Sequence, residues 1–209
     1  FLVFESNIKA NHWVRCNRKY LVKWLIRVTN QRTGKVWEDR FDLKGKRVYV
    51  SIDSSALGDT LAWFPHISEF KKQYECEVIV STFKNNLYRE LYPELTLADP
   101  GESVPGVYAA YQIGWYYDER NEPNMDHHPR DFRKIPMQAT TTDILGIDHF
   151  NLKARLTVPD GPSPYDAPYV CLGIHSTAQA KYWNNPEGWQ EVTDYFLSKG
   201  WKVVVLSHE

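Results

Sequence analysis

Residues 47–60 read RVYVSIDSSALGDT, a short apolar run that leads into a loop of small and polar residues. The apolar part, residues 47–52, is typical of a strand buried in a parallel sheet. After the loop, apolar residues recur every three or four positions as far as Tyr74, which predicts a helix. Pro65 lies inside this pattern, so we expect a kink there or a later start of the regular helix.

A second stretch, at residues 169–183, repeats this order. Its apolar run at 169–174 leads into the loop HSTAQAKYW. Asn185 is predicted to cap the next helix, with Pro186 in its first position and Gly200 at its end. Residues 202–206 then form another strand. Two strand–loop–helix starts of this kind predict two Rossmann-like halves.

The segments between the two loops alternate between strand and helix patterns. Strands are predicted at residues 77–81, 95–98 and 107–117, and helices at 86–92 and 137–145. Gly146 is expected to end the last helix. This alternation argues for an α/β fold with a doubly wound parallel sheet.

The chain divides into four regions. They are a β-rich N-terminal region with a hairpin (1–45), a first Rossmann-like domain (46–157), a linker (158–168) and the start of a second Rossmann-like domain (169–209). Four prolines in the eleven residues of 158–168 predict a stiff linker. A single βαβ unit cannot cover both faces of a parallel sheet, so we expect the second domain to be truncated and the chain to be a fragment.

Composition excludes several classes of function. The formal net charge of −1 gives no global field that would attract nucleic acid or an anionic membrane. No apolar run is long enough for a membrane-spanning helix. Cys16, Cys76 and Cys171 lie far apart and predict neither a disulfide framework nor a zinc site, so a cytoplasmic location is expected. The tryptophans Trp24, Trp37 and Trp63 are expected in the core.

Polar residues at the predicted strand ends are candidates for chemistry. Asp59 could act as a general base on a hydroxyl group, and the alternative is an ordinary helix N-cap. In the second loop, Ser176, Thr177 and Lys181 could hold a phosphate group, against the alternative of a solvated loop. Glu209 could bind ribose hydroxyls or lie in a surface loop. The run Asp126-His127-His128 resembles part of a metal site, but a loop without metal is favoured.

Taken together, the two motifs resemble those of the ADP-heptose-dependent heptosyltransferases. The residues that carry the resemblance are Leu57-Gly58-Asp59 followed by Leu61 and Pro65, and Ser176-Thr177-x-x-x-Lys181-x-Trp183. The aromatic β-rich region before the first strand is similar to that of one subgroup, the autotransporter strand-loop-strand O-heptosyltransferases. The resemblance covers most of the chain from about Tyr20 onward.

The resemblance implies a GT-B fold, a pair of Rossmann domains with the donor in the interdomain cleft. It implies transfer of heptose from ADP-heptose to serine hydroxyls of a bacterial autotransporter, with inversion at the anomeric carbon. Asp59 matches the general base, Ser176, Thr177 and Lys181 match the donor diphosphate site, and Glu209 falls near the ribose-binding glutamate. It further implies a cytoplasmic homo-oligomer whose iron is bound by a C-terminal cysteine cluster that residues 1–209 do not contain. No cofactor or metal ligand is therefore assigned within this chain.

Other functions remain open. Asn184 stands where lipopolysaccharide heptosyltransferases usually carry proline, which weakens the assignment to that branch. The alternatives are a glycosyltransferase of the lipopolysaccharide type and a non-catalytic module that binds a glycan or polypeptide. We expect weak or absent turnover from residues 1–209 alone.

Overall fold

The computed structural model describes residues 2–157, 161–176 and 178–206. The chain forms two compact units, Phe1–Thr157 and Val158–Glu209. Within the described residues, no helix is both long enough and apolar enough to cross a membrane.

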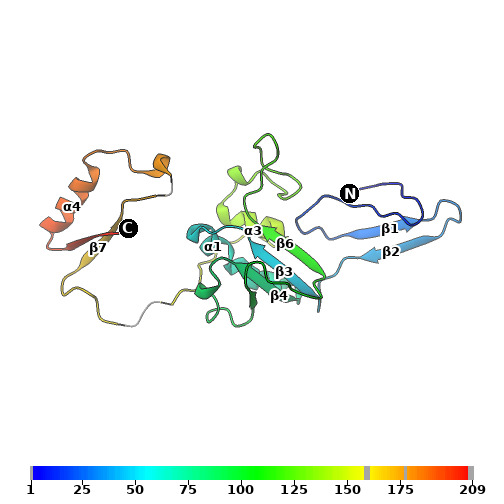
Figure 1. Cartoon of the computed structure of the whole chain (residues 1–209), viewed down its shortest axis with the longest axis horizontal. Helices are drawn as coiled ribbons and strands as arrows, with labels where there is room; N and C mark the ends of the chain where they lie inside the picture. Colours follow the sequence, from blue (N-terminus) through cyan, green and yellow to red (C-terminus); the bar gives the residue numbers. More distant parts are fainter. Residues whose placement is uncertain (1, 158–160, 177, 207–209) are drawn as a thin grey trace. The chain divides into compact units, whose positions relative to one another are not determined.

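The first unit is built around a four-stranded parallel sheet. Its strands are β3 (Arg47–Ile52), β4 (Glu77–Thr82), β5 (Thr96–Ala98) and β6 (Ala109–Ile113). They lie in the order β5-β4-β3-β6, and Figure 1 shows β3 and β6 running side by side in the same direction. The α/β fold with a parallel sheet is therefore confirmed. The strand order reverses between β3 and β6, which makes this point the topological switch point of the sheet.

Three helices accompany this sheet: α1 (Leu57–Trp63), α2 (Pro65–Tyr74) and α3 (Met137–Leu145). The expected effect of Pro65 is confirmed, because α1 stops at Trp63 and Pro65 opens α2. Gly146 ends α3 in the left-handed conformation with φ 62°, as predicted. The core between helices and sheet consists of fully buried side chains, among them Trp63, Phe64, Ile67, Phe70, Val48, Val50 and Ile144.

The helix predicted at residues 86–92 is wrong. A single 3-10 turn, η1 (Asn85–Leu87), stands there. The buried Asn85 side chain accepts a hydrogen bond from the Thr82 amide and donates one to the Ala98 carbonyl. These bonds tie together the ends of β4 and β5. An asparagine that satisfies the backbone in this way competes with helix formation.

The N-terminal hairpin is formed by β1 (Leu25–Thr29) and β2 (Val36–Arg40), drawn in blue in Figure 1. Every residue of both strands is exposed. Trp37 is 56% exposed, so the prediction that it lies in the core is wrong, whereas Trp63 is fully buried. The difference arises because alternating apolar residues predict a strand but do not supply a layer that covers it.

The second unit contains two parallel strands, β7 (Tyr169–Gly173) and β8 (Lys202–Leu206), and the helix α4 (Gly188–Ser198). The predicted cap is wrong, because the N-cap of α4 is Glu187 and not Asn185. The Asn185 side chain instead accepts a hydrogen bond from the Glu187 amide. Pro186 therefore lies before the helix rather than in its first position.

Candidate functional site

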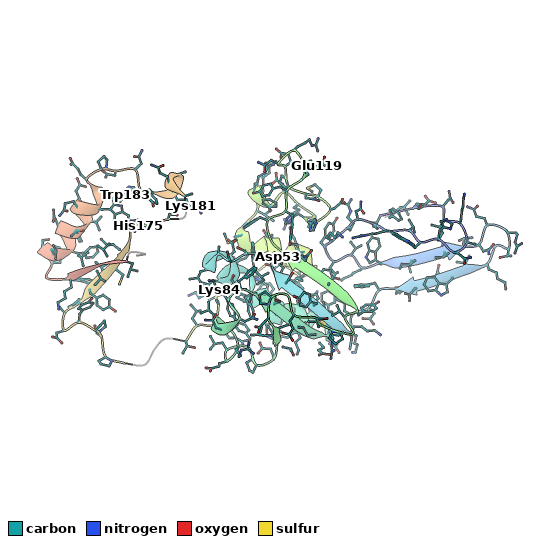
Figure 2. The ribbon with its side chains drawn as sticks, viewed as in Figure 1. Asp53, Lys84, Glu119, His175, Lys181 and Trp183 are labelled. Carbon is teal, nitrogen blue, oxygen red and sulfur yellow. The ribbon has the colours of Figure 1, made fainter. Side chains whose placement is uncertain are left out.

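The carboxyl ends of β3 and β6 form the candidate site. In open α/β sheets, ligands bind outside the carboxyl ends of the strands at the switch point. The loop after β3 carries Asp53 and Ser54, and the segment after β6 carries Trp115 and Tyr116. Figure 2 shows Asp53 at this end of the sheet. Side chains from the two segments meet there in two hydrogen-bonded groups.

The first group surrounds the carboxylate of Asp59, in the first turn of α1. The Ser54 hydroxyl donates a hydrogen bond of 2.7 Å to Asp59 Oδ2, and Trp115 Nε1 donates one of 3.0 Å to the same oxygen. The N-cap of α1 is Ala56, so the alternative that Asp59 is the N-cap is wrong. The Asp59 carboxylate is half-buried and accepts hydrogen bonds from side chains of two loops near the switch point of the sheet.

Trp115 is held by the core of the unit. Its indole lies 5.0 Å from the Trp63 ring and 5.0 Å from the Phe132 ring, centroid to centroid. Trp63 is itself fixed, because it is fully buried and its Nε1 donates a 3.0 Å hydrogen bond to the Met137 carbonyl. The donor to Asp59 is thus anchored through packed aromatic rings to the start of α3.

The second group surrounds Asp53. The Tyr116 hydroxyl and Gln112 Nε2 both donate hydrogen bonds to Asp53 Oδ2. Burial, together with this bond to Asp53, raises the pKa of Tyr116 far above its usual value. The phenol therefore stays protonated and acts as a donor. The Tyr116 ring also stacks on His127, with 4.1 Å between the ring centroids.

The two histidines of the run 126–128 support this loop. His128 is buried, and its Nε2 accepts a 3.3 Å hydrogen bond from the Tyr116 amide. Burial lowers the pKa of His128 to about 4, so the ring is neutral and can accept this bond. Burial also lowers the pKa of His127. Throughout the described residues, no group of three or more His, Cys, Asp or Glu side chains could hold a metal ion.

The remaining predicted residues belong to the second unit. Ser176 is half-buried and follows β7, and Lys181 is exposed at the end of η3 (Gln179–Lys181). Thr177 and Glu209 lie outside the described residues. Figure 2 labels Lys181 with His175 and Trp183 in the same connection between β7 and α4. Asp59 belongs to the first unit.

Gly188 opens α4 next to this connection. The Trp183 ring packs edge-on against Trp189, with 5.1 Å between the centroids. A Cβ atom added at Gly188 would lie 2.5 Å from the Trp183 ring and 2.7 Å from the Asn185 side-chain nitrogen. A glycine at this position therefore lets Trp183 lie against the start of the helix.

Sequence reasoning missed Asp53, Trp115 and Tyr116 as site residues. A signal was present, because Trp115 and Tyr116 lie in the last three residues of the run predicted as a strand at 107–117. Polar-tipped aromatic residues at the carboxyl end of a parallel strand face the ligand edge of the sheet. The pairing of β6 with β3, which brings them to Asp59 and Asp53, is a long-range contact that the sequence does not disclose.

The chain is similar to solved structures of a known enzyme. The chain matches the crystal structure of an iron-containing dodecameric glycosyltransferase, TibC from enterotoxigenic Escherichia coli H10407. The match has a TM-score of 0.85 and 32% identity, and it covers 94% of this chain and 51% of the TibC chain. A further TibC structure is a complex with ADP-D-beta-D-heptose. Both solved structures are therefore of a glycosyltransferase. No protein-family model matches the chain.

The chain is also similar in sequence to curated proteins with a more specific name. The chain is 32% identical over 201 residues to autotransporter heptosyltransferase TibC of Escherichia coli O78:H11 and 30% identical over 203 residues to autotransporter heptosyltransferase BAHTCr of Citrobacter rodentium. These matches cover 94% and 95% of this chain. A 26% identical relative, BimC of Burkholderia thailandensis, is named an inactive autotransporter heptosyltransferase. The resemblance predicted from the two loop motifs is confirmed: the homologues of this chain are autotransporter heptosyltransferases.

The chain spans about half the length of these relatives, 48% for both TibC and BAHTCr. TibC contains iron, whereas the described residues of this chain offer no group of three or more His, Cys, Asp or Glu side chains that could hold a metal ion. Cys76 is buried, Cys16 half-buried and Cys171 exposed, and all three are free. These three free cysteines do not fit an iron site.

Proposed function

We propose that this chain is the acceptor-activating part and the start of the donor-binding part of an inverting protein O-heptosyltransferase. It would transfer heptose from ADP-heptose to serine hydroxyls of a bacterial autotransporter. The observation that carries the proposal is the Asp59 carboxylate, held at the carboxyl end of β3 by donors from two loops. The homology to autotransporter heptosyltransferases and the ADP-heptose complex of TibC support the choice of donor and acceptor.

The reaction is a single displacement. The Asp59 carboxylate accepts the proton of the serine hydroxyl. The serine oxygen forms a bond to the anomeric carbon while the bond from that carbon to the diphosphate oxygen breaks. The electron pair of the broken bond leaves with ADP, and the transition state has oxocarbenium character. No covalent enzyme intermediate is required, and the configuration at the anomeric carbon inverts.

The second unit supplies the donor site in this proposal. Ser176, Thr177 and Lys181 bind the diphosphate, where hydroxyl groups and an ammonium group stabilise the charge that develops on the departing ADP. Glu209 binds the ribose hydroxyls. Together the two units would form a GT-B transferase of the cytoplasm that assembles as a homo-oligomer, and the dodecameric state of TibC supports the assembly.

Intact-protein mass spectrometry tests the proposal. The full-length protein is incubated with ADP-heptose and an autotransporter passenger fragment. We expect the fragment to gain the mass of one anhydroheptose unit per modified serine, and replacement of those serines by alanine should abolish the gain. No mass gain on the passenger, combined with transfer to lipopolysaccharide core acceptors, would instead identify a lipopolysaccharide-type enzyme.

The inactive relative BimC favours a second candidate, a module that binds its ligand without transfer. In that case the protein would bind the autotransporter passenger without increasing the mass of the passenger. It would also transfer no sugar to lipopolysaccharide core acceptors. A pull-down of the passenger alongside the mass measurement separates this candidate from the transferase.

A further inference from the structure

We infer that Trp115 and Ser54 are positioning residues that reserve Asp59 Oδ1 as the oxygen that takes the acceptor proton. This inference rests on the proposed function of Asp59 as the base. Beyond that proposal, the inference names the carboxylate oxygen that takes the proton and the side chains that determine this choice. Neither Trp115 nor Ser54 touches the substrate in this scheme, and both act through the carboxylate.

The geometry of the hydrogen bonds distinguishes the two carboxylate oxygens. Both donors, the Ser54 hydroxyl at 2.7 Å and Trp115 Nε1 at 3.0 Å, reach Oδ2. A carboxylate oxygen offers about two lone-pair sites, so two donors saturate Oδ2. No further hydrogen bond to the Asp59 carboxylate is formed by the side chains and amides that the structure describes. Oδ1 therefore keeps the lone pairs that a proton acceptor needs.

The direction of the Ser54 hydroxyl is also set. The Ala56 amide donates a 3.2 Å hydrogen bond to Ser54 Oγ, which leaves that hydroxyl to use its own proton on Asp59. The loop after β3 thus forms a short relay from the backbone amide through Ser54 to the carboxylate. A hydroxyl whose oxygen already accepts a bond is a better donor.

Trp115 supplies rigidity. Its indole is wedged between Trp63 and Phe132, and Trp63 is fully buried and bonded to the Met137 carbonyl. A carboxylate in the first turn of a helix can rotate about its terminal torsion, and such rotation exchanges Oδ1 and Oδ2. Two donors fixed on one oxygen oppose this rotation. Positioning of this kind matters because a displacement of about 1 Å at a reacting group can cost about 100-fold in rate.

The test is steady-state kinetics on the full-length protein with Trp115→Phe, Ser54→Ala and Ser54→Thr. Trp115→Phe keeps an aromatic ring next to Trp63, removes the N–H donor and reduces the size of the ring system. We expect kcat to fall about 10- to 100-fold in Trp115→Phe and about 10-fold in Ser54→Ala, with KM for ADP-heptose changed less than about 2-fold. Ser54→Thr restores the hydroxyl and should recover most of the kcat lost in Ser54→Ala. Trp37→Phe is the matched control, because the exposed Trp37 lies outside the site, and it should leave kcat unchanged.

Two results separate this inference from the proposed function. If Asp59→Asn abolishes transfer while Trp115→Phe and Ser54→Ala keep the wild-type kcat, the positioning role is wrong and the base assignment stands. If Asp59→Asn keeps wild-type transfer, the proposed base itself is wrong. A merely structural role for Trp115 would lower the melting temperature or change KM without a selective fall in kcat. The Ser54 pair gives a readout even if Trp115→Phe fails to fold.

Discussion

The buried ring of His128, next to the candidate site, makes the stability of the protein depend on pH. It is buried, and its pKa of about 4 lies well below the value of 6.5 for a free imidazole. The unfolded chain therefore binds a proton at a higher pH than the folded chain does. The free energy of unfolding is therefore unaffected by protonation of His128 above pH 6.5. It decreases as the pH falls from 6.5 towards 4, by at most about 3 kcal/mol.

Denaturant unfolding at a series of pH values checks this prediction. His128→Gln keeps an acceptor for the Tyr116 amide but cannot titrate, so its free energy of unfolding should depend less steeply on pH between 6.5 and 4. The neighbouring His127, whose pKa is also lowered, is present in both proteins and cancels in the comparison. Parallel pH profiles for the two proteins would contradict the assignment.

Gly146 gives a second test at the residue scale. Its φ of +62° is left-handed, and an added Cβ would lie 2.8 Å from Leu21 Cδ2. We expect Gly146→Ala to lower the free energy of unfolding by about 2–3 kcal/mol. Gly45→Ala is the control, because Gly45 has φ +67° with no atom within 4 Å of its Cβ position, and it should cost only about 1 kcal/mol. Equal losses in chemical denaturation would show that the contact with Leu21 does not matter.

For single residues, the sequence predicted the place of a side chain along the chain better than it predicted the residues that contact it. Asp59 was placed at a strand–helix junction because that junction is written in local periodicity. Its donor Trp115 is 56 positions away, and their contact depends on which strands pair. The functional roles of Asp59, Ser176, Thr177, Lys181 and Glu209 stay predictions.

Among the elements, two strands that were predicted from short apolar runs have the bounds that the structure shows. The bounds of β3 and β8 agree with the predicted runs at 47–52 and 202–206. The failures at residues 86–92 and at Asn185 share a physical cause: in each case an asparagine side chain bonds the backbone of a turn. Such bonds depend on loop geometry, which helix periodicity does not encode.

The contrast between the hairpin and the helix core makes a prediction at the element scale. Trp37 on β2 is exposed, whereas Trp63 at the end of α1 is fully buried and bonded to Met137. We expect Trp63→Ala to lower the free energy of unfolding by about 3–5 kcal/mol and Trp37→Ala to change it by less than about 0.5 kcal/mol. Urea unfolding followed by circular dichroism measures both. A large loss in Trp37→Ala would mean that the hairpin is packed against another surface.

At the scale of the whole molecule, the two units differ in the size of the hydrophobic core that each contains. The first unit has a buried cluster between its sheet and helices, whereas Leu172 is the one buried apolar side chain among the described residues of the second unit. A chain of roughly 50 residues with so small a core falls near the limit for independent folding. We therefore expect residues 1–157 to unfold cooperatively when expressed alone and residues 158–209 to remain unfolded.

Circular dichroism and amide proton dispersion of the two separate pieces check this expectation. A cooperative thermal transition in the piece 158–209 would contradict it. The parallel α/β architecture of the whole was predictable because strand–loop–helix starts recur along the chain. The arrangement of two units as a GT-B pair stays a prediction, since periodicity within each unit carries no information about how the units combine.

The most direct test of the proposed transferase is Asp59→Asn in the full-length protein, assayed for both donor binding and transfer. Asparagine keeps the shape of the side chain and removes the charge that accepts the proton. We predict that ADP-heptose still binds with an unchanged dissociation constant, while the mass of the autotransporter fragment no longer increases. Transfer at the wild-type rate in Asp59→Asn would contradict the assignment of Asp59 as the general base.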